Sequence, residues 1–270
     1  MLRQPTAKLE WSALRVMKFG GSVLKDRGAL SAVATHIIAM RDGGQFPVVV
    51  VSALAGETDR LLALSRHVGA ADGSREQDAI LATGEHQAAA LLAVALQSCG
   101  SPAQSFTAAQ LPIVTDACYG NAAVRFVAVE ALLAAVSKGI IPVVAGFQGV
   151  TDDGSLTTLG RGGSDTTAVA IAAALGGVPC ELIKDVAGVF ATDPRRDAQA
   201  LPLARLTFNQ MIELAAHGAK VLQLKSVELA AAHGVSLLVR DLADSSFGTW
   251  IVPNHEAMTL NTQLEHGWQS

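Results

Sequence analysis

Residues 47–52 read Pro-Val-Val-Val-Val-Ser, so an unbroken apolar run lies between Pro47 and Ser52. A strand with one face in water alternates apolar and polar residues, whereas an unbroken run is expected where both faces are buried. Strands of that kind occur in parallel sheets that helices cover on both sides. The run therefore predicts an α/β fold built on a mostly parallel central sheet.

Similar strand-like runs occur before and after residues 47–52. Each short β-branched run ends in a Gly-rich or polar turn and is followed by a longer Ala- and Leu-rich stretch. Strands that alternate with helices predict a three-layer α/β/α sandwich, whose ligands should sit beyond the carboxyl ends of the strands. The turn-rich residues 148–163 have room for a small hairpin. Further strands are predicted at residues 14–19, 140–147, 180–184 and 235–239, and helices at residues 22–40, 85–96, 122–135, 165–175, 207–216 and 225–233.

The composition favours one packed domain. The chain has 270 residues, of which 50% are hydrophobic and 16% are charged, and this balance excludes a largely disordered chain. No repeat or linker divides the sequence. A single catalytic domain is therefore expected over residues 14–252, between an N-terminal extension of residues 1–13 and a C-terminal tail of residues 253–270.

Charge, hydropathy and cysteine content indicate the partners and the compartment. The net charge of −4 gives no general attraction to nucleic acid or to an anionic membrane. The apolar runs are too short to span a bilayer, and the first residues lack the apolar region of a signal peptide. Cys99, Cys118 and Cys180 show no metal-type spacing and suit reduced thiols in the cytoplasm.

A lysine near the end of the first predicted strand begins the string Lys18-Phe19-Gly20-Gly21-Ser22. Glycines let the backbone approach a ligand closely, and free amides at the start of a helix can bind phosphate oxygens. The Gly-x-x-x-x-Gly-Lys-Ser/Thr pattern of P-loop proteins is absent from the sequence. Taken alone, the string is equally compatible with a tight turn that carries an exposed lysine.

Two further strings place charged residues in turns. In Gly160-Arg161-Gly162-Gly163-Ser164-Asp165, the glycines leave the arginine room to bind a planar anion bidentately, and Ser164 or Asp165 can cap the following helix. The other string starts with Lys184-Asp185 at a strand end and finishes with the turn Asp193-Pro194-Arg195. Without a ligand-binding role, the first string would be an ordinary flexible loop with a helix cap, and the second would be a strand followed by two turns.

Together, these strings resemble the aspartokinase branch of the amino acid kinase superfamily over residues 16–252. The most specific segment is Leu-Gly-Arg-Gly-Gly-Ser-Asp at residues 159–165. The other matching segments are residues 18–22, 50–56, 83–85, 114–116, 119–122, 146–149, 192–195 and 218–222.

The resemblance implies an amino acid kinase fold and an ATP-dependent phosphorylation of the side-chain carboxylate of aspartate, in amino-acid biosynthesis. Lys18 would neutralise the transferring phosphoryl group, and Asp165 would orient Lys18. Glu85 would accept the α-ammonium of the substrate, and Arg161 would bind its α-carboxylate. The rest of the acceptor site would be lined by Ser52, Thr58, Phe147 and Ser164.

For the nucleotide, the resemblance implies a phosphate cradle and an adenine site. The backbone around Gly20 and Gly21, with Ser22, would hold the β- and γ-phosphates, whereas Lys184 and Asp185 would contact the adenine. Mg²⁺ would arrive with the ATP rather than occupy a metal site of the protein. The remaining contacts along the nucleotide would come from Phe190, Asp193, Arg195 and Lys220.

Departures from the family pattern leave alternatives open. Gln223-Leu224 stands where the family usually has His-Pro, and His86 stands where an arginine is usual. The residues after Val252 are too few for an ACT-type regulatory domain, so the sequence predicts an enzyme without that feedback control, and a homodimer is compatible with it. The alternatives are a kinase of the same fold acting on another small acid, which Glu85 and Arg161 argue against, and a non-catalytic nucleotide-binding protein.

Overall fold

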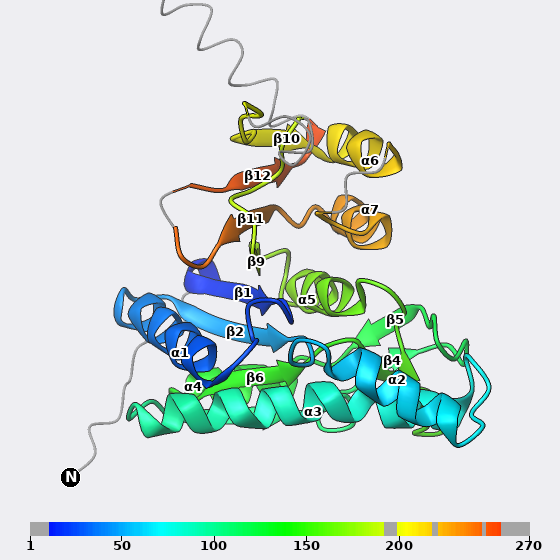
Figure 1. Ribbon diagram of the computed structural model, residues 1–270. Helices are drawn as coiled ribbons and strands as arrows, with labels where there is room; N and C mark the ends of the chain where they lie inside the picture. The colour runs from blue at the N-terminus through cyan, green and yellow to red at the C-terminus, as the bar shows by residue number, and fades with distance from the viewer. Residues whose placement is uncertain (1–10, 192–198, 218–220, 245–246, 255–270) are drawn as a thin grey trace, which may run out of the picture.

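The computed structural model describes residues 11–191, 199–217, 221–244 and 247–254. Its central sheet has eight strands in the order β10-β12-β11-β9-β1-β2-β6-β3 (Figure 1). Every neighbouring pair is parallel except β11 with β12, which confirms the predicted α/β fold with a mostly parallel sheet. The strands are β1 (Leu14–Phe19), β2 (Phe46–Val51), β3 (Ala103–Phe106), β6 (Ile141–Ala145), β9 (Cys180–Lys184), β10 (Arg205–Thr207), β11 (Leu237–Asp241) and β12 (Thr249–Val252).

The pleat of β1 decides which face of the sheet carries its lysine. Leu14 and Val16 belong to one apolar cluster, and Met17 belongs to the cluster on the opposite face. Because successive side chains of a strand alternate between faces, Lys18 shares the face of Leu14 and Val16. That face is the one against which helix α5 packs.

Helices cover both faces of the sheet, as the three-layer prediction requires (Figure 1). One face packs against α1 (Arg27–Asp42) and α3 (Arg75–Ser98), with α2 (Glu57–His67) lying on α3. The small side chains of α5 are buried over the whole of residues 163–172, which lets this helix approach β1 closely. The helices on this second face are α4 (Glu130–Ser137), α5 (Gly163–Ala174), α6 (Phe208–Ala216) and α7 (Leu224–His233).

A second sheet has the order β5-β4-β7-β8 and supplies loops to the carboxyl edge of the central sheet. β7 and β8 pair antiparallel and form the small hairpin expected in residues 148–163. The helix predicted at residues 122–135 is wrong in its first half, because Val-Arg-Phe-Val at residues 124–127 pairs with β4 as a strand. The strands of this sheet are β4 (Ile113–Thr115), β5 (Val124–Val127), β7 (Gln148–Val150) and β8 (Leu156–Thr158).

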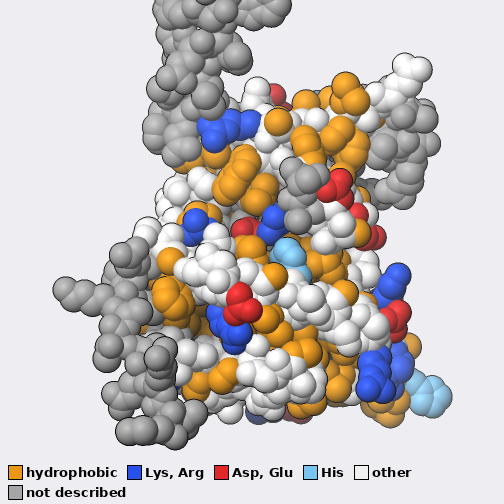
Figure 2. Space-filling model, turned by 90° about the vertical axis from the view of Figure 1, so that its left-hand side faces the viewer, with side chains coloured by type: hydrophobic (Ala, Val, Ile, Leu, Met, Phe, Trp, Pro, Cys, Tyr) orange, Lys and Arg blue, Asp and Glu red, His pale blue; other side chains and the backbone are white. Residues whose placement is uncertain are grey.

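α3 is long and apolar enough to cross a membrane by length and composition, and it is the only described helix of that kind. Half of its most apolar window is buried inside the protein, and two acidic residues, Asp78 and Glu85, are buried along it. The helix therefore packs as a core element of this fold. On the face drawn in Figure 2, basic and acidic side chains are intermixed rather than gathered by sign.

Candidate functional site

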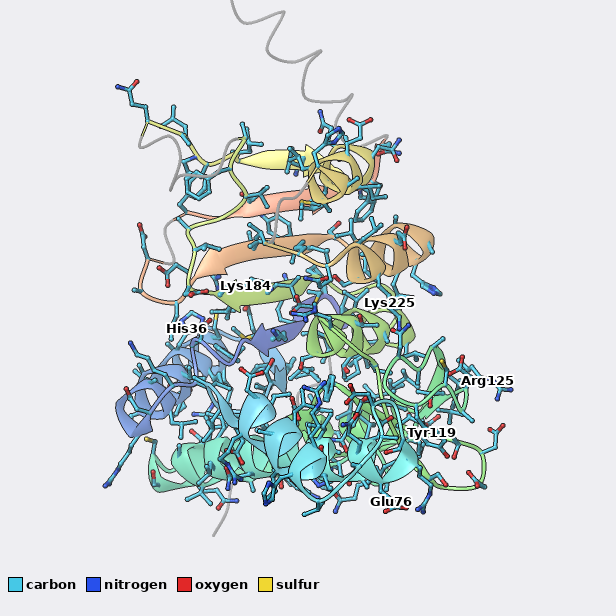
Figure 3. All side chains as sticks on the ribbon, turned by 45° about the vertical axis from the view of Figure 1, so that its right-hand side comes forward. His36, Glu76, Tyr119, Arg125, Lys184 and Lys225 are labelled. Carbon is cyan, nitrogen blue, oxygen red and sulfur yellow. The ribbon has the colours of Figure 1, made fainter. Side chains whose placement is uncertain are left out.

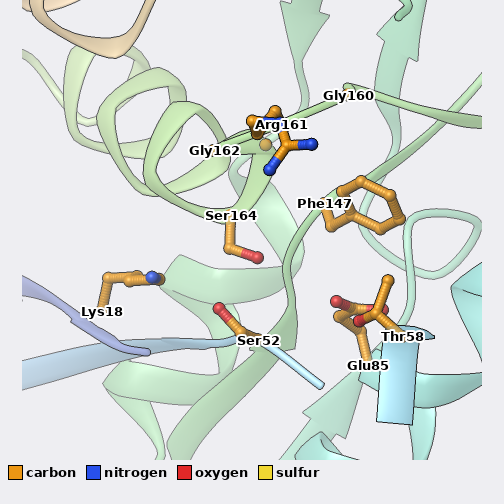
Figure 4. Close-up of a pocket in the computed structure, with 10 residues that line it drawn as sticks. Lys18, Ser52, Thr58, Glu85, Phe147, Gly160, Arg161, Gly162 and Ser164 are labelled. Carbon is orange, nitrogen blue, oxygen red and sulfur yellow. The ribbon is translucent and has the colours of Figure 1, made fainter. Parts of the chain in front are cut away.

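A cavity of about 220 Å³ lies at the carboxyl ends of the central strands (Figure 4). Ser52 follows β2 and Phe147 follows β6, as expected for a ligand site of a parallel sheet. Helices α2 and α3 contribute Thr58 and Glu85. The structure thus brings the six residues predicted for the acceptor site together with Lys18, although their roles stay a prediction. The lining consists of Lys18, Ser52, Thr58, Glu85, Phe147, Gly160, Arg161, Gly162, Gly163 and Ser164.

Two lysines from neighbouring strands bind one carboxylate beside this cavity. Lys18 Nζ lies 2.7 Å from Oδ1 of Asp165, and Lys184 Nζ lies 2.8 Å from Oδ2. Asp165 stands in the first turn of α5, which packs on β1. The structure contains the predicted contact between Asp165 and Lys18. It also places the ammonium of Lys184, which was predicted at the adenine, on the same carboxylate.

The electrostatics of this cluster favour the ionised carboxylate. Burial would raise the pKa of Asp165, but the charges of Lys18 and Lys184 outweigh that effect and bring the pKa to about 2. Burial lowers the pKa of Lys18, and the attraction of Asp165 opposes this change. Two ammonium groups share one carboxylate, so one positive charge remains available to an anion in the cavity.

Glu85 is a buried carboxylate that uses only one of its oxygens. Its Oε1 accepts a hydrogen bond from the Ala53 amide at 3.0 Å, whereas Oε2 has no partner among the described residues. Burial raises the pKa of Glu85 to about 7, against the opposing effects of the Ala53 amide and the charge of Lys18. A positively charged ligand group would supply the missing partner and stabilise the ionised form.

Arg161 supplies a cation on the opposite side of the cavity from Glu85 (Figure 4). It is exposed, and within the described part of the chain no ion pair engages its guanidinium. Gly160 and Gly162 both have a φ of 75°, in the left-handed region that glycine adopts at little cost. A Cβ at Gly162 would lie only 2.3 Å from the side chain of Gln223, so no other residue fits there.

Phe147 has a strained backbone at the edge of the cavity. Its φ of 68° makes it the one non-glycine residue in the left-handed region within the described ranges. Such a conformation costs roughly 1–3 kcal/mol and persists only where neighbours hold it. Its amide donates to Thr167 Oγ1 at 3.0 Å, and its carbonyl accepts from the Leu159 amide at 2.8 Å. These contacts hold the ring in the wall of the cavity.

The glycine pair after β1 forms a tight turn rather than the start of a helix. The predicted helix begins only at Arg27, and the amide of Val23 donates to the carbonyl of Gly20 at 3.0 Å. A Cβ at Gly21 would lie 2.8 Å from the Ala53 carbonyl oxygen, whereas one at Gly20 would lie 3.6 Å from Lys18 Nζ. The turn therefore packs against residues 53–55 on one side and has room for a methyl group beside Lys18 on the other.

The remaining nucleotide predictions within the described residues follow the carboxyl ends of β1 and β9. Ser22 and Asp185 are exposed, and Phe190 is half-buried in a bridge with Pro202. Within the described part of the chain, His, Cys, Asp and Glu side chains do not gather in a group of three that could hold a metal ion. Three predicted nucleotide contacts, Asp193, Arg195 and Lys220, lie outside the described residues.

Sequence reasoning missed the pairing of Lys184 with Asp165. A signal for it exists in the pleat, because Lys184 alternates with Cys180 and Leu182 and so shares their face of β9. β9 lies next to β1, and both lysines stand near the ends of their strands on the same face. Two strand-end lysines on one face, with an aspartate at the start of the helix that covers them, predict such a cluster.

Comparisons with known proteins agree with this architecture. Residues 13–241 match the amino acid kinase family. An aspartate kinase of Stutzerimonas stutzeri is 43% identical over 244 residues, which are 90% of this chain and 59% of that relative. An aspartokinase of Mycobacterium tuberculosis is 46% identical over 241 residues, 89% of this chain and 57% of the relative. The chain thus spans less than two thirds of the length of these relatives.

Solved structures show the same likeness. The aspartate kinase from Synechocystis superposes with a TM-score of 0.79 at 42% identity, over 89% of this chain and 40% of that chain. Aspartokinase III of E. coli, solved in complex with aspartate and ADP, superposes with a TM-score of 0.78 at 25% identity, over 89% of this chain and 64% of that chain.

Proposed function

The chain belongs to the amino acid kinase family, and we propose that it transfers the γ-phosphoryl group of ATP to the side-chain carboxylate of aspartate. The product would be an acyl phosphate, 4-phospho-aspartate. The similarity to enzymes named aspartokinase supports this activity, as does the E. coli relative solved with aspartate and ADP. The cavity itself supplies the more specific support.

The observation that carries the proposal is the pairing of a buried anion with a cation across one small cavity. Glu85 presents an oxygen without a partner, and Arg161 presents a guanidinium without an ion pair among the described residues. An α-amino acid carries an ammonium and a carboxylate on one carbon, so it would satisfy both groups at once. Lys18 lies in the lining of the same cavity and would receive the side chain of the acceptor.

In this arrangement, catalysis rests on positioning and on charge. Phosphoryl transfer leaves little covalent chemistry to the protein, which mainly aligns the two oxygens and offsets negative charge. The ammonium of Lys18, held by Asp165, would stand between the acceptor carboxylate and the γ-phosphate. Lys184 adds a second positive charge to the same cluster. No residue needs to act as a strong base, because a carboxylate acceptor is already ionised near neutral pH.

The turn at Gly20 and Gly21 would hold the β- and γ-phosphates beside Lys18. The Gly20 amide donates to the Ile183 carbonyl oxygen at 3.2 Å, so the backbone amides of Gly21 and Ser22 would bind the phosphates. Mg²⁺ would enter on the phosphates, because this cation commonly binds through substrate phosphates and few protein carboxylates. Asp165 is bound by both lysines in the protein and would serve to orient them.

A trapping assay tests the proposal. The purified protein, ATP, Mg²⁺ and a panel of amino acids and small dicarboxylates are incubated with hydroxylamine, which converts acyl phosphates to hydroxamates. We expect hydroxamate from aspartate well above that from glutamate, succinate or N-acetylglutamate. Hydroxamate mainly from another acid would identify that acid as the acceptor in place of aspartate. Normal ATP binding without hydroxamate from any acid would favour a nucleotide-binding protein and defeat the proposal.

A further inference from the structure

Asp78 is a completely buried carboxylate outside the cavity, in the first turn of α3. Three donors converge on it. Oδ2 accepts from the Thr158 amide at 2.7 Å and from the Gly120 amide at 2.9 Å, and Oδ1 accepts from the Thr158 hydroxyl at 2.7 Å. An ionised carboxylate offers only acceptor sites, so it can satisfy all three buried donors together. Asp78 thereby ties α3 to the end of β8, two residues before Gly160.

The positively charged Lys225 binds the residue that follows Thr158, in the loop that leads to Arg161. It projects from α7 (Figure 3), and its Nζ donates to the carbonyl oxygens of Ala122 at 2.8 Å and Leu159 at 3.3 Å. The donors of Thr158 and the acceptor of Leu159 are neighbours in the chain. A carboxylate on one helix and an ammonium on another therefore fix consecutive peptide groups immediately before Gly160 and Arg161.

The loop has little space in which to shift. A Cβ at Gly160 would lie 2.8 Å from Asn121 Oδ1 and 3.1 Å from the Gly120 carbonyl oxygen. The turn around Gly120 is the segment that Asp78 and Lys225 also bind. The backbone that leads into Arg161 is consequently packed against the turn around Gly120, which Asp78 and Lys225 hold in place.

Glu85 stands seven residues after Asp78 on α3, which is about two helical turns and hence the same side of the helix. One rigid helix thus carries the carboxylate of the cavity and the carboxylate that anchors the arginine loop. We infer that Asp78 and Lys225 are positioning residues that set the separation between Glu85 and Arg161. Resting on the proposed function, this gives them a part in selecting an α-amino acid as acceptor.

Steady-state kinetics with aspartate, succinate and ATP test the inference in Asp78→Ala and Lys225→Met. Since small misplacements of binding groups reduce rates strongly, we expect the KM for aspartate to rise about tenfold in each. As the KM for aspartate rises, the preference for aspartate over succinate should decrease. The KM for ATP should stay within about twofold of wild type. Asp78→Asn should recover most of the loss, because its amide oxygen can accept from the Thr158 amide while the Thr158 hydroxyl turns to accept from its NH₂ group.

The matched control is Glu76→Ala, since Glu76 lies on the same turn of α3 with a side chain that is 72% exposed (Figure 3). It should leave all constants at wild-type values. If Asp78→Ala does not fold, Lys225→Met carries the test, because Lys225 is only partly buried. A folded variant whose kcat falls while its KM for aspartate and its selectivity stay unchanged would overturn the inference and leave the proposed function intact.

A wild-type protein that phosphorylates a different acid would refute the proposed acceptor alone. The inference would then be tested by the KM of that acid in the same variants. Calorimetric titration measures whether the wild-type protein binds any acid of the panel. A wild-type protein that neither binds nor phosphorylates any acid of the panel would defeat both, because no acceptor would exist for the loop to position.

Discussion

The ammonium of Lys18 lies 2.7 Å from Oδ1 of Asp165, and the two side chains are only 7% and 4% exposed. A buried pair of this kind gains little net stability, because desolvation offsets most of the attraction. Its value lies in orientation, since a charge held rigidly in a dry site acts on a transition state without having to reorganise.

Lys18→Ala should therefore reduce kcat far more than it weakens ATP binding. By comparison with the removal of one preorganised donor, we expect a loss of about 10²–10³-fold. Asp165→Asn should damage the same step, and the double variant should lose much less than the product of the single losses. Initial rates and calorimetric ATP titrations provide the measurements. Near-normal turnover of Lys18→Ala would refute the role given to this lysine.

A substitution of Lys184 can distinguish two roles for this lysine, one through Asp165 and one at the adenine. If its charge acts through Asp165, Lys184→Met should lower kcat about tenfold or more with a small change in the KM for ATP. If it serves the adenine, as the family resemblance implies, the KM for ATP should rise instead while kcat changes little. Lys138→Met, which removes an exposed lysine at the end of α4, is the control and should change neither constant.

Arg161 and Glu85 should decide acceptor selectivity. Each charge-assisted contact is worth about 1.5–3 kcal/mol, so succinate, which lacks the ammonium, should lose at least about tenfold in kcat/KM against aspartate. Glu85→Gln should narrow this gap. Arg161→Lys should not restore recognition, because an ammonium cannot form the planar bidentate contact. A variant Arg161→Ala that raises only the KM for ATP and keeps the selectivity would show that the arginine serves the phosphates.

The pKa of Glu85, raised by burial to about 7, predicts a pH dependence of activity. The ionised carboxylate is the form that would bind an ammonium, so kcat/KM for aspartate should increase as the pH rises through about 7 and then level off. Rates measured in overlapping buffers from pH 5.5 to about 8.5 would reveal this step. Its persistence in Glu85→Gln would assign the titration to another group.

The same shift predicts a pH dependence of stability. Between the ordinary value of 4.5 and the folded value of about 7, the folded protein holds a proton that the unfolded chain has released. The stability contribution of Glu85 is therefore full below the lower value and is lost as the pH rises through the higher one. Glu85→Gln, which stays neutral, should raise the melting temperature at pH 8 more than at pH 5. Equal shifts at the two pH values would contradict the assignment.

The two glycines after β1 should respond differently to alanine. In Gly21→Ala the new methyl group would meet the Ala53 carbonyl oxygen at 2.8 Å, so the turn must move and the melting temperature should fall. In Gly20→Ala the methyl group would lie 3.6 Å from Lys18 Nζ, an ordinary contact, so the fold should persist. The KM for ATP should rise in that variant, because the group would occupy space proposed for a phosphate. Unchanged ATP binding in folded Gly20→Ala would argue against a phosphate cradle there.

Much of the fold could be predicted because its signals are local. The apolar run at residues 47–52 became β2, residues 14–19 and 180–184 became strands with the predicted bounds, and the hairpin in residues 148–163 followed from its turns. The miss at residues 122–135 has a local cause as well. Ala-rich flanks favoured a helix, whereas Val-Arg-Phe-Val gained a partner in β4, and pairing with this preceding strand overrode the propensity of the flanks.

What the sequence by itself determined, then, is the five adjacent strands β11, β9, β1, β2 and β6 of the central sheet, most of the helices that alternate with them, and the set of residues at the strand ends. Pleat, helical period and glycine turns are encoded within a few neighbouring residues. Only the tertiary structure decided that Lys184 shares Asp165 with Lys18, that Asp78 anchors the loop of Arg161, and that Glu85 keeps one oxygen without a partner among the described residues. Those relationships join residues from distant parts of the chain, and their energies depend on burial and on the direction of each donor. The pleat of β9 puts Lys184 on the correct face of the sheet, but no local pattern gives its partner, which is fixed only when packing removes water and brings the groups together.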